Sequence, residues 1–141
     1  MTGVSWSGAA TRFLAVRLEP GADLRRGLIE VFDAQPERAG FVAAAVGSLT
    51  VAALRMAGEP EVERIAGPLE IVGLSGTLSV DGPHLHLAVS LSDGRMLGGH
   101  LMDGARVRTT AEIVLGLAAG VVFERPVDPA TGYRELSGRE G

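Results

Sequence analysis

The sequence contains no cysteine and no lysine, and it has few aromatic residues. The lack of cysteine excludes both a disulfide framework and a thiolate metal site. The net charge of −4 argues against phosphate binding by the whole surface, although a local arginine patch is compatible with it. No apolar run approaches the roughly 20 residues of a membrane span, and the first residues do not resemble a signal peptide. We therefore expect a soluble, cytoplasmic protein.

The length and amino-acid composition of the chain favour one small domain built mainly from a β-sheet. The 141 residues suffice for a single core, which Leu, Val, Ala and Ile must fill because only 4% of residues are aromatic. Twenty glycines suit a sheet with tight turns. We expect one domain over residues 1–141, with a loose N-terminus at 1–10 and a frayed tail at 137–141. Such an apolar small domain also indicates that some apolar surface is buried between subunits.

Hydrophobic periodicity predicts one helix among many strands. Asp23 is a suitable N-cap, and apolar residues from Leu24 to Phe32 recur with helical spacing before Pro36 ends the helix. Alternating or apolar segments joined by Gly, Pro and Asp turns predict antiparallel strands. The main expected strands are 11–18, 41–46, 49–56, 61–66, 69–80, 84–92, 96–101, 109–117 and 120–125. The fold class is therefore α+β, a curved, mostly antiparallel sheet with one main helix packed on it.

All three histidines of the chain lie between residues 84 and 100. Side chains alternate along a strand, so Leu85 and Leu87 face the core while His84 and His86 share the other face. Their Cβ atoms are expected roughly 6–7 Å apart, close enough for two imidazoles to bind one ion. This pair by itself is a weak signal, and the position of His100 decides its strength.

The turn at Asp93-Gly94 determines where His100 lies. A two-residue turn pairs Leu87 with His100 and places His100 on the core face. A three-residue loop, Asp93 to Arg95, pairs Ala88 with His100 and puts it diagonally from His86, within side-chain reach. A bulge at Gly98-Gly99 has the same effect. The hydrophobic pattern favours the offset register because it also turns Leu97 and Leu101 towards the core. We predict three histidines on one face, with an open position beside them.

Three neutral imidazoles and an open position are typical of a zinc site that binds water or a ligand. The alternative is a set of hydrogen-bonded surface or interface histidines. Glu70 and Glu112 lie in apolar strands, and each is either exposed, at an interface, or a buried acid that could serve as a general base. A zinc-dependent enzyme acting on a small polar substrate, with one of these acids as base, is therefore an alternative to a binding protein.

An ordered series of motifs resembles a known family, the plants-and-prokaryotes-conserved domain (PPC, also written PCC). The resemblance covers nearly the whole chain, from Pro20-Gly21-Ala22-Asp23-Leu24 to Phe123-Glu-Arg125 and Thr131-Gly-Tyr133. Its motifs are Gly67-Pro-Leu-Glu-Ile-Val72, Leu74-Ser-Gly-Thr-Leu-Ser79, His84-Leu-His86, Asp93-Gly94, Gly98-Gly-His-Leu101 and Thr109-Thr-Ala-Glu-Ile-Val114.

The resemblance implies a homotrimer with an α+β fold and a metal site at His84, His86 and His100. It further implies a binding or assembly module with DNA or protein partners, because plant members carry a DNA-binding AT-hook before the domain. The Arg-Gly-Arg-Pro core of an AT-hook does not occur in this sequence. Whether the metal site lies within one subunit or between subunits is left open by the sequence.

Overall fold

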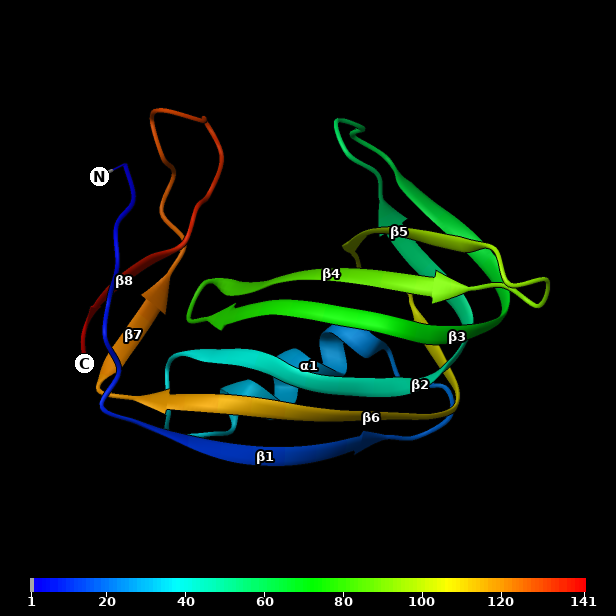
Figure 1. The fold of residues 1–141 in the computed structure, drawn as a ribbon, viewed down its shortest axis with the longest axis horizontal. Coiled ribbons are helices and arrows are strands. Elements are labelled where there is room, and N and C mark those ends of the chain that lie inside the picture. Colours follow the sequence, from blue (N-terminus) through cyan, green and yellow to red (C-terminus); the bar gives the residue numbers. More distant parts are fainter. Residues whose placement is uncertain (1) are drawn as a thin grey trace.

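The computed structural model describes residues 2–141 and consists of two antiparallel sheets and one helix (Figure 1). The elements in chain order are β1 Ala10–Leu18, α1 Leu24–Asp33, β2 Gly40–Arg55, β3 Val62–Ser79, β4 Gly82–Ser90, β5 Met96–Leu101, β6 Arg106–Ala119, β7 Val121–Glu124 and β8 Ser137–Glu140. The predicted α+β class, a mostly antiparallel sheet with one helix, is confirmed.

The larger sheet has the order β1-β6-β2-β3-β4-β5, and β5 also pairs with the end of β2. This last pairing joins Leu54 to Leu101 and Arg55 to His100. Strands β2, β3, β4 and β5 therefore form a closed ring of pairings. The closure fixes both edges of the β4–β5 hairpin, which carries all three histidines.

Helix α1 lies behind the sheet in Figure 1. The Asp23 carboxylate accepts a hydrogen bond from the Arg26 backbone N–H, as expected of an N-cap. Its other oxygen accepts from the Gly104 N–H, so the cap also anchors the loop before β6. Leu24, Leu28 and Phe32 are buried in the core beneath the sheet. The helix thereby covers the core face and leaves the opposite face of the sheet free.

Strands β2 and β3 are longer than the sequence indicated. The expected break at Gly47-Ser48 is a register shift within one continuous β2, and the expected turn at Gly67-Pro68 lies inside β3. Residues 61–66 therefore do not form a separate short strand. The reason is that a bulge absorbs an irregular residue locally while pairing resumes on either side.

The C-terminal segment also departs from expectation. Residues 137–140, expected as a frayed tail, form β8 and pair with β7. Residues 2–9 precede the first strand without regular secondary structure, as expected, and Ala10 already belongs to β1; Met1 lies outside the described residues. Within residues 2–141 no helix is long and apolar enough to cross a membrane.

Candidate metal site

The β4–β5 hairpin places His100 directly opposite His86. The loop is one residue earlier than expected, because the Leu91 N–H donates to the Arg95 carbonyl and leaves Ser92, Asp93 and Gly94 in the turn. The predicted pairing of His100 with Ala88 was therefore wrong: the observed partner, His86, lies two residues earlier in β4. A shift of two preserves the face on which a side chain lies, so the prediction that all three histidines share one face is confirmed.

Leu97 lies on the core-facing side of β5, as expected, but is less buried than expected. It pairs with Val89, which is fully buried, yet Leu97 itself is 39% exposed. Leu101, the other residue used to choose the register, is buried as predicted. The residues of β5 nearest the turn are thus exposed, and the second pairing with β2 is at the His100 end.

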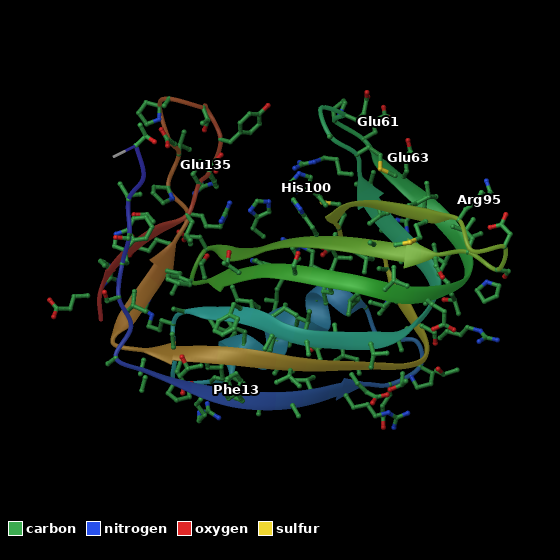
Figure 2. The ribbon with its side chains drawn as sticks, in the orientation of Figure 1. Phe13, Glu61, Glu63, Arg95, His100 and Glu135 are labelled. Atoms are coloured by element: carbon green, nitrogen blue, oxygen red, sulfur yellow. The ribbon has the colours of Figure 1, made fainter. Side chains whose placement is uncertain are left out.

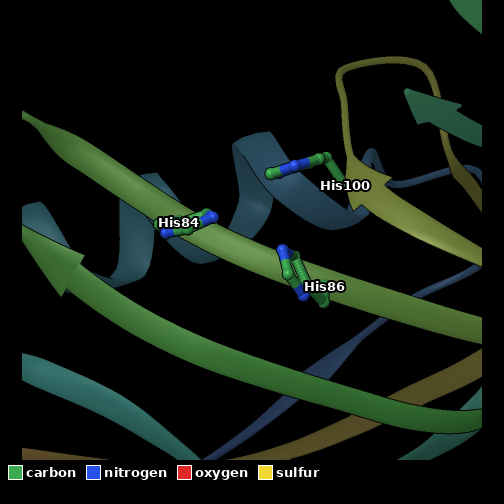
Figure 3. A group of neighbouring side chains, drawn as sticks. All are labelled: His84, His86 and His100. Atoms are coloured by element: carbon green, nitrogen blue, oxygen red, sulfur yellow. The ribbon is translucent and has the colours of Figure 1, made fainter. Parts of the chain in front are cut away.

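The three imidazoles meet above the outer face of β4 (Figure 3). Ring centroids are 5.1 Å apart for His84 and His86, 5.3 Å for His84 and His100, and 4.6 Å for His86 and His100. One nitrogen from each ring lies within 4.8 Å of the other two. Nitrogens bound tetrahedrally to zinc at about 2.0–2.1 Å lie roughly 3.3–3.4 Å apart. Binding of zinc would therefore bring the three ring nitrogens closer together than they are in this structure.

The surroundings lower the pKa of two of the three rings. Burial lowers the pKa of His84, and the positive charge of Arg125 and the other two histidines lowers it further, whereas Glu135 raises it. Burial also lowers the pKa of His100, followed by the charges of His86 and Arg55. Metal binding requires the neutral imidazole, so these shifts favour a ligand role. The three imidazoles are a donor set of the type that zinc takes, and the lowered pKa of His84 and His100 favours their neutral, metal-binding form.

Arg125 is a residue at this site that the sequence did not reveal. Its guanidinium Nη2 lies 3.2 Å from His84 Nδ1 and 2.9 Å from the Arg134 carbonyl oxygen. Its backbone N–H donates to Asp81, which fixes the start of the C-terminal segment beside β4. Figure 2 shows His100 and Glu135 on the same side of β4, with Glu135 contributed by that segment. No sequence pattern connects residues so far apart in the chain.

The two acids proposed as general bases do not join the histidines. Glu70 is exposed in β3, where it pairs with Ser90, four residues along β4 from His86. Glu112 is exposed in β6 and accepts a hydrogen bond from Thr110. Among residues 2–141 the histidine cluster includes no carboxylate. Both acids therefore match the exposed alternative considered for them.

A glycine beneath the hairpin allows His84 to take its position. Gly76 pairs with Leu85 and has a φ of +139°, a conformation that L side chains rarely adopt. A Cβ atom there would collide with the His84 carbonyl oxygen. Close approach of the β3 backbone to His84 thus depends on the missing side chain.

Comparison with known proteins decides the family. The sequence profile of the Plants and Prokaryotes Conserved (PCC) domain matches residues 6–119. The chain belongs to this family. The resemblance noted from the sequence motifs is thereby confirmed.

Related proteins agree with this assignment. A solved protein structure from Salmonella cholerae-suis (Salmonella enterica) is 41% identical, with a TM-score of 0.92 over 95% of this chain and 97% of its own. A metal-containing protein from Archaeoglobus fulgidus is 27% identical, with a TM-score of 0.78 over 97% of this PCC chain and 99% of its own. Two structures described as candidate DNA-binding proteins, from Bacteroides thetaiotaomicron and Ralstonia eutropha, are 18% and 20% identical and show the fold alone, with TM-scores of 0.78 and 0.72.

Curated relatives place the domain within longer proteins. Two Synechococcus proteins named Bifunctional protein GlmU are 50% and 49% identical over 125 and 121 residues, which is 89% and 86% of this PCC chain. The chain spans about a fifth of the length of these relatives.

Proposed function

We propose that this PCC-domain protein binds one zinc ion per chain through His84, His86 and His100. It then acts as a homotrimeric binding or assembly module. The observation that carries the proposal is the convergence of one nitrogen from each ring within 4.8 Å. These are all the histidines of the chain, brought together from two strands. The name of the Archaeoglobus relative, a metal-containing protein, supports it at 27% identity over nearly the whole chain.

The cluster favours binding over catalysis. A hydrolytic zinc site commonly needs a nearby base in addition to the metal-bound water. Neither Glu70 nor Glu112 joins the histidines, and Glu135, whose charge acts on His84, is held by Thr131 and is not among the clustered groups. The open fourth position is therefore better suited to holding a ligand than to turning over a substrate.

The outer face of β1, β6 and β2 supports association with further copies. Phe13 is 63% exposed and Val46 is 57% exposed, and the strand register places both on the same side of the sheet. Phe41 lies across Gly116 beside Phe13, which extends the apolar surface. Exposed apolar patches of this kind mark interaction surfaces. We propose that second and third copies of this chain cover it.

Sedimentation of the purified protein tests the trimer. The expected mass is three times the 14.6 kDa of a single chain. Phe13→Asp should dissociate the assembly because it places a charge in the apolar contact, whereas Arg95→Asp on the hairpin loop should not. A monomer for the unmodified protein at about 100 μM would contradict the trimer.

DNA is the partner suggested by the family and by the two low-identity structures. The net charge of −4 opposes it, and Arg12, Arg25 and Arg95 are each paired with an acid on the surface. We expect no gel shift at micromolar protein and about physiological salt. A shift that weakens steeply with added salt would instead establish direct phosphate contacts and a DNA-binding role.

Elemental analysis tests the metal itself. Protein purified after growth with added zinc should contain one ion per chain, and His100→Ala should contain none. Glu70→Gln is a matched control because it alters a polar group on a neighbouring strand outside the cluster. Absence of metal from the unmodified protein would contradict the proposal.

A further inference from the structure

Arg125 is a buried cation that lacks an acidic partner. The residue is only 9% exposed, and within residues 2–141 no carboxylate oxygen lies within 4.0 Å of its guanidinium. The side chain instead donates to a carbonyl oxygen of Arg134 and to the neutral ring of His84. A buried charge without a counterion is costly, so this arrangement leaves a place for an anion.

The contact with His84 is incompatible with a metal on that ring. A guanidinium only donates hydrogen bonds, so His84 Nδ1 must accept and the neutral ring carries its proton on Nε2. Coordination through Nδ1 requires the same lone pair that Arg125 occupies. Coordination through Nε2 requires the proton to move to Nδ1, where it would oppose the guanidinium. In either case Arg125 must release His84 and find another acceptor.

A second arginine adds positive charge beside His100. Arg55 pairs with His100 across β2 and β5, and its charge acts on the His100 ring. Arg55 also forms no ion pair within 4.0 Å among the described residues. The histidines are therefore flanked by two uncompensated arginines in a protein whose overall charge is negative.

We infer that the histidine face binds a small molecule bearing an oxyanion, a carboxylate or a phosphate, with Arg125 as its anchor. The oxyanion accepts the hydrogen bond that Arg125 otherwise donates to His84. A guanidinium can present two parallel N–H donors to such a group. The same oxyanion lies next to the open coordination position. The inference rests on the proposed metal site for this last contact, while the Arg125 contact stands without it.

Glu135 is the competing acceptor within the chain. Its charge already acts on His84, and its carboxylate accepts a hydrogen bond from Thr131. A rotation towards Arg125 would satisfy the guanidinium internally and leave no need for an external anion. The variant Glu135→Gln therefore separates the two cases.

The test uses cobalt as the ion and acetate or inorganic phosphate as the anion. Visible absorption of the cobalt-loaded protein should change saturably with millimolar anion at constant ionic strength. Phosphate acting more tightly than acetate would identify a phosphate ligand, and the reverse order a carboxylate. Arg125→Gln should weaken this response about tenfold or more, as loss of a charge-assisted hydrogen bond implies. Arg17→Gln is the matched control, since Arg17 lies on the edge strand β1 at the other end of the strand order from the hairpin and bonds only Thr109 and Thr110.

Several results would overturn the inference. A cobalt band that forms but ignores both anions would do so, as would equal anion binding by Arg125→Gln. Anion binding seen only in Glu135→Gln would assign the counterion to Glu135. If Arg125→Gln fails to fold by circular dichroism, Arg125→Lys keeps the charge without the planar fork and should also weaken binding.

Failure of the metal proposal gives a different result. In that case cobalt produces no band at all, and the anions are titrated against the metal-free protein. The imidazole ¹⁵N signals of His84 should still shift with phosphate, and the shift should depend on Arg125. No shift would overturn the anion site independently of the metal.

Discussion

The two faces of strand β4 differ in role: one packs in the core and the other carries the candidate metal ligands. Leu85, Leu87 and Val89 face inward and are almost completely buried in the core. His84 and His86 point outward, where His100 joins them from β5. One strand therefore supplies stability from one face and candidate ligands from the other. The comparison implies that stability and metal binding can be changed independently.

Truncation of the core face should have the largest effect on stability. Leu87 is 1% exposed, so Leu87→Ala removes buried methyl groups and leaves a cavity that costs about 2–5 kcal/mol. Urea unfolding measures this loss. Leu97→Ala, on the same hairpin but half-exposed, is the control and should cost less than about 1 kcal/mol. Equal losses for the two variants would contradict the separation of faces.

Removal of an outward-facing histidine should instead lower zinc affinity and leave stability nearly unchanged. His100→Ala is expected to reduce zinc affinity by more than about 100-fold, since even loss of an outer partner of a ligand costs 10- to 100-fold. Unfolding of the metal-free protein should change little because the ring is on the surface side of the sheet. Calorimetric titration and urea unfolding give the two values. A variant that keeps full zinc affinity would show that His100 is not a ligand.

Gly76 joins the two faces, so its substitution should disturb both. Gly76→Ala introduces a Cβ into the His84 carbonyl and forces an L residue into an unfavourable φ, at a cost of about 1–3 kcal/mol or more. Zinc affinity should fall as well, because the β4 backbone at His84 must shift. Gly58→Ala is the control for strain alone, since Gly58 has a positive φ but no neighbour within 4 Å. Loss of stability without loss of affinity would mean that His84 is positioned independently of β3.

The smallest effect is a pH dependence of stability in the metal-free protein. The folded state lowers the pKa of His84 and His100, so the unfolded chain binds more protons as the pH falls through the ordinary histidine pKa of about 6.5. Stability should therefore decrease from pH 7.5 to pH 5.5 and level off below the folded-state pKa. Urea midpoints at these pH values measure the slope, which should diminish in His84→Gln. An unchanged slope in that variant would assign it to other groups.

Local patterns predicted much of this site. Alternation along β4 determined which face His84 and His86 occupy, and the burial of Leu101 put His100 on the same face. The register still differed by two residues because the exact loop depends on the Leu91–Arg95 hydrogen bond, which residue type alone does not specify. Face and register are separate properties, and only the first follows from periodicity.

Features that depend on distant contacts were missed. Arg125 reaches His84 from 41 positions along the chain, and its role is visible only once the C-terminal segment crosses β4. Strand β8 forms because β7 offers it a partner, although the charged, small residues of 137–140 have little strand preference. Gly67-Pro68 resembled a turn locally, yet pairing with β2 resumes around it.

The most direct test of the central claim is the imidazole ¹⁵N spectrum during a zinc titration. The chain has three histidines, so every ring is observed without interference from others. The account predicts that the signals of His84, His86 and His100 all change together and that the change is complete at one zinc per chain. A titration in which any one of the three rings keeps its metal-free signal would contradict a three-histidine site.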